Sequence, residues 1–156
     1  MARSEHESAR EYYRQGLKLL ESGDALKALD LLSRAHLLDA NDPQIQSSFA
    51  LALARARGQR DQALRLAHEA LRRQFYEPRL YVNLAQIHIC FGDPAAAVRA
   101  LRRALAVDSS SGPARTLLRE LGVRRRPVIP ALGRSNPINR TLGRIRSRVR
   151  PATNPA

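Results

Sequence analysis

Apolar residues recur along this chain at helical spacing, in segments that end at glycine-containing turns. The first segment has them at Ala9, Tyr12, Tyr13, Gly16, Leu17, Leu19 and Leu20. Turn glycines follow at intervals of 35 and then 34 residues, and an alanine pair returns at a fixed distance behind each one: Gly23 with Ala28 and Ala35, Gly58 with Ala63 and Ala70, Gly92 with Ala97 and Ala104. A period of this length, filled with helix formers, predicts an array of helical hairpins.

The residues between the helical segments indicate where the predicted helices begin and end. Asp93 is a predicted helix cap and Pro94 a first helical residue, where its missing N–H costs nothing. We expect an all-α protein with three hairpin units, at about residues 8–42, 43–77 and 78–111, followed by a capping helix over 112–121. A polar end cap is a requirement of such arrays. Residues 4–121 therefore form the predicted folded domain, and 122–156 form a tail.

The repeated residues resemble the tetratricopeptide repeat family, whose units combine large residues and a small pair in the first helix with two alanines in the second. The corresponding positions are Tyr12, Gln15, Gly16, Leu19, Ala28, Leu32 and Ala35 in the first unit, Ser47, Ala50, Leu51, Ala54, Ala63, Ala67 and Ala70 in the second, and Tyr81, Leu84, Ala85, His88, Ala97, Leu101 and Ala104 in the third. The resemblance implies a right-handed superhelical solenoid. The second unit has small residues in large-residue positions, which predicts a thin core there.

In this family the first helix of each hairpin lines a groove that takes up peptides. The resemblance therefore implies that the groove residues are Arg10, Tyr13, Arg14, Leu17 and Leu20, then Ile45, Ser48, Phe49, Ala52 and Arg55, then Arg79, Val82, Asn83, Gln86 and Ile89. The lysine and asparagine clamp with which some members hold a terminal carboxylate is absent. The groove is apolar with arginines at its edges, which favours an apolar segment with acidic flanks. For Leu17 and Ala52, a place in the core between hairpins is the alternative.

Charge is distributed unevenly along the chain. Residues 1–121 carry 18 basic and 14 acidic side chains, whereas residues 122–156 carry 9 arginines and no acidic residue, within a total net charge of +13. Of the 27 basic residues, 25 are arginine, which is typical of GC-rich, bacterial coding and also suits bidentate contacts to anions. One cysteine, no signal-peptide pattern and no membrane-length apolar run favour a cytoplasmic location.

The tail combines prolines with a short amphipathic pattern. Ile138, Leu142, Ile145 and Val149 fall on one face of a predicted helix over residues 137–149, which Gly143 weakens. Three interpretations are open: the tail packs back on the solenoid, it folds on an acidic partner protein, or it binds nucleic acid or anionic lipid weakly. In the last two, the anionic contacts would come from Arg124, Arg125, Arg126, Arg140, Arg144, Arg146, Arg148 and Arg150.

Catalytic and metal-binding patterns are missing from the sequence. His88 occupies a core position, and its spacing from Cys90 places the two side chains in different directions, which is poor metal geometry. We therefore expect no enzyme activity and no cofactor or metal. The sequence predicts a protein-binding adaptor or chaperone-like module, with the tail as a second contact. The alternative is an RNA- or ribosome-associated protein that acts through the tail.

Overall fold

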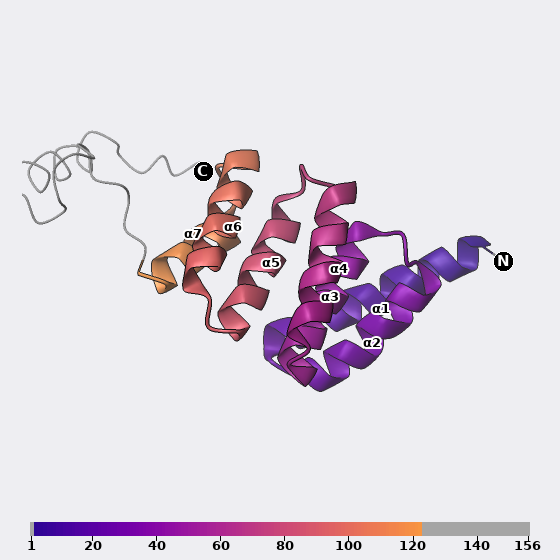
Figure 1. Ribbon diagram of the computed structural model, residues 1–156. Helices are drawn as coiled ribbons and strands as arrows, with labels where there is room; N and C mark the ends of the chain where they lie inside the picture. Colours follow the sequence, from indigo (N-terminus) through magenta and orange to yellow (C-terminus); the bar gives the residue numbers. More distant parts are fainter. Residues whose placement is uncertain (1, 123–156) are drawn as a thin grey trace, which may run out of the picture. The chain divides into compact units, whose positions relative to one another are not determined.

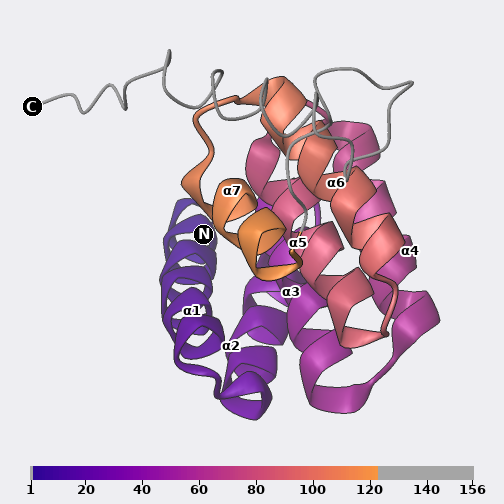
Figure 2. The ribbon, with the colours of Figure 1, turned by 90° about the vertical axis from the view of Figure 1, so that its left-hand side faces the viewer.

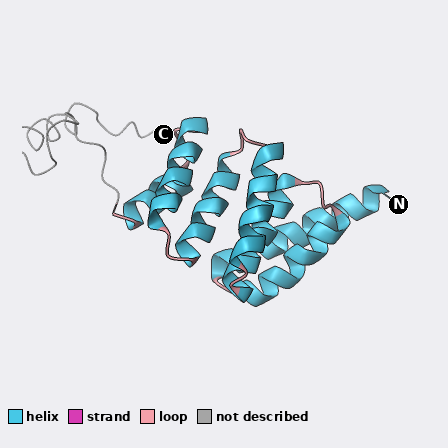
Figure 3. Cartoon of the chain, in the orientation of Figure 1, coloured by secondary structure: helices cyan, strands magenta, loops and turns pink. Residues whose placement is uncertain are grey.

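A computed structural model describes residues 2–122 of the chain, and these residues form helices connected by short turns (Figures 1 and 3). The described helices are α1 (Ala2–Ser22), α2 (Ala25–Leu38), α3 (Pro43–Arg57), α4 (Arg60–Arg73), α5 (Pro78–Cys90), α6 (Pro94–Val107) and α7 (Gly112–Glu120). The all-α prediction is confirmed for this part of the chain. The predicted helix over 137–149 and the tail arginines lie outside the described residues.

Helix boundaries follow from caps, prolines and glycines. Asp42, Glu77 and Asp93 each accept a hydrogen bond from a backbone N–H in the first turn of α3, α5 and α6, respectively, and a proline opens each of these helices. Gly58 ends α3 with a φ of 63°, in the left-handed region where glycine carries no Cβ penalty. Asp24 caps α2 in the same way as Asp93 caps α6. These local signals divide the chain into antiparallel pairs, α1/α2, α3/α4 and α5/α6.

Small residues allow the helices of each pair to approach closely. The repeated alanines are fully buried, and the residues between them, Leu32, Ala67 and Leu101, are buried as well. Gly16 on α1 faces Leu32 on α2, and a Cβ placed on Gly16 would lie 2.6 Å from Leu32 Cγ. The alanine period therefore marks the contact between the two helices of a hairpin.

The middle hairpin is held partly by polar contacts. Ser47 and Ser48 are fully buried, and the Asn83 side-chain amide on α5 donates to both hydroxyls at 3.1 and 3.4 Å. α3 packs against α5 along much of its length, whereas α1 touches α3 at only a few residues. α3 also packs against α2 along much of its length, so it joins the second hairpin to both of its neighbours.

α7 closes the C-terminal end of the folded part by packing on α6 (Figure 2). Ala114 is fully buried, and Leu117, Leu118 and Leu121 are partly buried against the core. Among the described residues, no helix combines the length and apolar character needed to cross a membrane.

Residues 1–122 form a unit separate from residues 123–156. A chain shortened to residues 1–122 should therefore keep its helices and unfold cooperatively, because the core contacts from α1 to α7 are all present. Circular dichroism during heating measures this directly. A gradual, non-cooperative melt that becomes cooperative when residues 123–156 are restored would contradict this expectation.

Candidate functional site

The first helices of the three pairs line a groove of about 750 Å³ together with the connection between α6 and α7. This groove is hereafter the main groove. Its lining residues are Leu17, Leu20, Glu21, Gly23, Leu51, Arg55, Glu77, Pro78, Arg79, Val82, Asn83, Gln86, Asp108, Ser110, Ser111, Gly112 and Pro113. Of the predicted groove residues, the structure brings together Leu17, Leu20, Arg55, Arg79, Val82, Asn83 and Gln86 in it.

Aliphatic side chains from three helices give the main groove its apolar lining. Leu17 on α1, Leu51 on α3 and Val82 on α5 all contribute to it. Leu51 and Val82 are also part of the hydrophobic core, whereas Leu17 is partly buried against it. The apolar lining is therefore held in place by the fold and is available to an incoming side chain mainly at Leu17.

Arg55 connects the helices across the main groove. Its Nη1 donates to the Leu20 carbonyl oxygen at 3.0 Å, near the C-terminus of α1, and its Nη2 donates to Gln86 Oε1 at 2.6 Å. A cation at a helix C-terminus is favourable because the last carbonyls there have no partner within the helix. Arg79, at the rim, lies 4.0 Å from Glu21 in an exposed ion pair. Arg55 therefore has a positioning role as well as a place in the lining.

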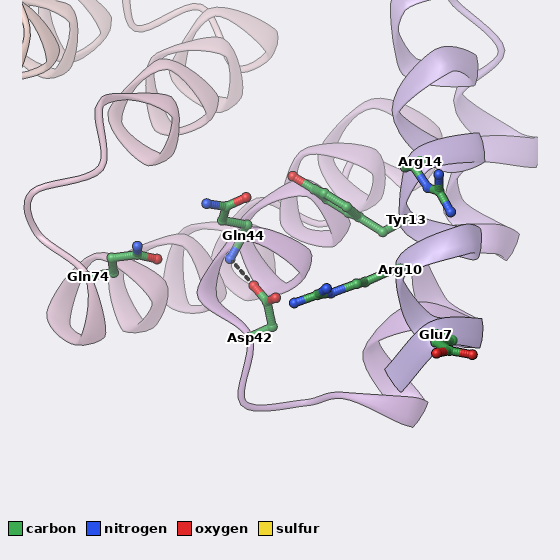
Figure 4. Close-up of a pocket in the computed structure, with 7 residues that line it drawn as sticks. All are labelled: Glu7, Arg10, Tyr13, Arg14, Asp42, Gln44 and Gln74. Atoms are coloured by element: carbon green, nitrogen blue, oxygen red, sulfur yellow. Dashed lines mark hydrogen bonds between the residues drawn. The ribbon is translucent and has the colours of Figure 1, made fainter. Parts of the chain in front are cut away.

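A second, polar pocket of about 740 Å³ lies toward the N-terminal ends of α1 and α3. It is lined by Glu7, Arg10, Tyr13, Arg14, Asp42, Gln44 and Gln74, so three more predicted groove residues belong to it (Figure 4). The Asp42 carboxylate accepts the Gln44 backbone N–H at 2.7 Å. Arg14 pairs with Glu11, whereas Arg10 forms no ion pair with any described residue and extends toward Asp42 in the close-up view.

Tyr13 links this polar pocket to the buried serines of α3. Burial raises the pKa of the Tyr13 hydroxyl, and the Ser48 hydroxyl offsets part of that rise. The contact with Ser48 falls outside hydrogen-bonding geometry, and the Tyr13 hydroxyl has no hydrogen-bond partner among residues 2–122. Tyr13 therefore lines the polar pocket while its hydroxyl is buried.

Five predicted groove residues line neither cavity, and three of them require correction because they are buried: the five are Ile45, Ser48, Phe49, Ala52 and Ile89. Ile45, Ser48 and Ala52 are buried between helices. The Phe49 ring stacks on His36 of α2, with centroids 5.1 Å apart, so it packs against the preceding hairpin. Ile89 lies in the last turn of α5, beyond the lining. For Ala52 the structure confirms the alternative, a core position.

The reason for most of these differences lies in the rotation of α3. The cavity-facing residues of this helix are Gln44, Leu51 and Arg55, spaced seven and four apart, which is one helical face. The assignment of groove residues from equivalent repeat positions instead selected Ile45 and Ala52, each one residue after a cavity-facing residue. α3 packs against α2, α4 and α5, and in this packing Ile45 and Ala52 are buried between helices.

Residues of the α6–α7 connection were missed by sequence reasoning. Asp108 and Ser110 of this connection lie in the main-groove lining, as does Pro113 at the start of α7. The Asp108 carboxylate accepts both the backbone N–H and the hydroxyl of Ser110, at 2.8 and 2.6 Å. These bonds lower the pKa of the Asp108 carboxyl. A signal was available in the run Asp108-Ser109-Ser110-Ser111, which is typical of a turn before a helix.

The predicted packed histidine is found in the structure. His88 is partly buried, and its Nδ1 lies 3.9 Å from Asp93 Oδ2. Cys90 is exposed. Within residues 2–122, no three histidine, cysteine, aspartate or glutamate side chains gather in a way that could hold a metal ion.

Stability should decrease in mild acid because of two histidines. Burial lowers the pKa of both His36 and His88. In the unfolded chain their pKa is about 6.5, so below that pH the unfolded state binds more protons and the free energy of unfolding falls. We expect a lower melting temperature at about pH 5.5 than at about pH 7.5. The double variant His36→Gln/His88→Gln should show a smaller difference, and an unchanged difference would contradict the assignment.

Comparison with known proteins identifies the fold. No protein-family model and no curated protein sequence matches this chain. Solved structures do. The TPR domain of Arabidopsis OM64 is 15% identical, with a TM-score of 0.60 over 76% of this chain and 97% of that one. The first TPR of RPAP3 bound to an HSP90 peptide is 17% identical, with a TM-score of 0.58 over 75% and 92%.

A third similar structure is that of a bacterial protein in complex with part of its partner. PcrH, a Pseudomonas aeruginosa protein, in complex with the chaperone binding region of PopB is 21% identical, with a TM-score of 0.54 over 74% of this chain and 93% of that one. Together these likenesses show that the chain has the tetratricopeptide repeat fold, as the alanine and glycine period predicted.

Proposed function

We propose that this protein binds a segment of another protein in the main groove. The observation that carries the proposal is the lining itself: three helices and one connection, far apart in sequence, surround a single volume of about 750 Å³ with aliphatic side chains and amides. Cavities of this size and mixed lining are suited to ligand side chains with a few polar groups that fix their orientation.

The charges around the main groove refine the kind of segment. Glu21, Glu77 and Asp108 belong to the lining together with Arg55 and Arg79. Arg55 already donates to Leu20 and Gln86, and Arg79 pairs with Glu21. Apolar anchors therefore supply most of the attraction in the main groove. Acidic flanks of the partner segment are best placed at the polar pocket, where Arg10 has no ion-pair partner among the described residues.

Two of the structural neighbours lend support. The RPAP3 domain is bound to an HSP90 peptide, and PcrH is in complex with the chaperone binding region of PopB. Both have the fold seen here and both hold a segment of another protein. An adaptor or chaperone-like role, without catalysis, is the function that this fold and this groove serve best. We place the protein in the cytoplasm and give the arginine tail the role of a second contact with the partner.

Selection from a random peptide library displayed on phage tests the proposal with no assumption about the identity of the partner. The full-length chain is the bait, and the selected peptides should share apolar anchor residues. A Leu17→Glu bait should recover few of them, because Leu17 is the partly exposed aliphatic residue of the lining. Recovery of the same peptides by both baits would show that binding occurs elsewhere.

A further inference from the structure

The outward side of α6 carries three exposed arginines, of which Arg99 lies near enough to the Asp93 carboxylate to help lower its pKa. Arg99, Arg102 and Arg103 are exposed, and the sequence of α6 contains no acidic residue. None of the three guanidinium groups forms an ion pair or hydrogen bond with another residue of the described part of the chain. These three arginines, hereafter the α6 arginines, are therefore free to contact an anion.

The second helices of the other pairs differ in this respect. On the first hairpin, Lys27 pairs with Asp24 at 2.8 Å and Arg34 pairs with Asp30 at 3.1 Å. On α4, Arg72 lies 3.8 Å from Glu69. Cations of α2 thus have ion-pair partners, and so does one arginine of α4. The arginines of α6 form no ion pair with any described residue.

Further positive charge lies close to the α6 arginines. Burial lowers the pKa of His88 on α5, and the charges of Arg60 on α4 and Arg99 on α6 add to that shift. Arg60 also lies over the Phe91 ring, 5.9 Å from its centroid. The Asp93 carboxylate caps α6, accepting the Ala96 N–H at 2.9 Å, and this hydrogen bond lowers its pKa, with smaller contributions from the charges of Arg99 and Arg60. In Figure 2, α4 and α6 lie on the side of the molecule away from α1.

We propose that the α6 arginines bind the phosphate backbone of single-stranded nucleic acid, on a surface separate from the main groove. Arg99 and Arg103 are one helical turn apart, a rise of about 6 Å, so one strand can offer phosphates to both. Guanidinium groups match phosphate oxygens in bidentate geometry. No α6 arginine lines a described cavity, so this contact recognises charge and not base sequence.

Membrane lipid is the less suitable source of phosphate. An interfacial helix needs bulky apolar residues beside its cations in order to enter the acyl boundary. The exposed neighbours of the α6 arginines are Ala95 and Ala106, and Val107 is 40% exposed at the end of the helix. Nothing larger is available for insertion on this side of α6.

The dependence of binding on salt tests the proposal. Each phosphate contact contributes about 0.7 to the slope of log affinity against log salt for a single strand. With a single-stranded uridine oligonucleotide and the full-length chain, the variant Arg99→Gln/Arg102→Gln/Arg103→Gln should lower that slope by about 2. Each single substitution should lower it by about 0.7. Circular dichroism verifies that the variants fold.

A charge-matched control separates a specific surface from net charge. Lys27→Gln/Arg34→Gln/Arg72→Gln removes the same three charges from cations that already have partners, and its slope should equal that of the wild type. The tail arginines contribute equally to all these proteins. The proposal is wrong if both triple variants lower the slope equally, if neither does, or if the wild type does not bind the oligonucleotide. It is also wrong if only binding to phosphatidylserine vesicles responds to the α6 triple variant.

Discussion

Leu17→Glu should weaken binding of a library-selected peptide by at least about 30-fold, the effect of losing one interface hot spot of about 2 kcal/mol. Leu17 lines the main groove and is only partly buried, so an apolar anchor of the peptide can pack against it. A carboxylate at this position would face the aliphatic side chains of Leu51 and Val82 and would have to be desolvated when the peptide binds.

Leu26→Glu is the matched control for this experiment. Leu26 lies on α2, is 69% exposed and lines neither the main groove nor the polar pocket. Its substitution introduces the same charge and should leave the affinity within about two-fold, since surface changes away from an interface have small effects. Isothermal titration calorimetry measures the peptide affinity of both variants. Equal losses in the two variants, or no loss in either, would contradict a binding site at Leu17.

Gly16→Ala should destabilise the wild-type protein and stabilise the Leu32→Ala variant. In the wild type, the new Cβ would lie 2.6 Å from Leu32 Cγ and 2.9 Å from Cδ2, and Leu32 is fully buried. Overpacking of this kind costs about 1–3 kcal/mol, more than the gain of about 1 kcal/mol from alanine in a helix. Leu32→Ala alone should cost about 2–5 kcal/mol through the cavity it leaves.

In the double variant the clash is absent and the new methyl group occupies part of the cavity. The coupling free energy should therefore be favourable, at about 0.5–3 kcal/mol. Urea unfolding of the wild type, the two single variants and the double variant measures this coupling free energy in a double-mutant cycle. Gly112→Ala, where a Cβ meets no atom within 4 Å, is the control for a glycine change without a clash. Strict additivity of the two substitutions would show that α1 and α2 are not in contact at Gly16.

The fold was predictable because its determinants are local and periodic. Buried alanines such as Ala28 and Ala97 lie at the contact between paired helices, where only a small side chain fits, so packing imposes a period that the sequence displays. Asp93 and Pro94 determine a helix start through hydrogen bonding and a fixed φ, and both effects depend on neighbouring residues alone.

The candidate site was only partly predictable, because it depends on how hairpins are placed relative to each other. Repeat position selects Arg55 and Val82, which line the main groove, but on α3 it selects Ala52 where the structure has Leu51 in the lining. The side of α3 that faces the cavity depends on how this helix packs against α2, α4 and α5. The α6–α7 connection lines the same groove as residues of α1 that are far away in the sequence, and no period in the sequence records this arrangement.

NMR mapping should place a bound protein segment in the main groove. A peptide selected against the full-length chain is titrated into the isotopically labelled protein. The largest amide shifts should occur at the groove-lining turns of α1, α3 and α5, around Leu17, Leu51 and Gln86. Shifts confined to the outward sides of α2, α4 and α6, with these turns unaffected, would contradict the claim.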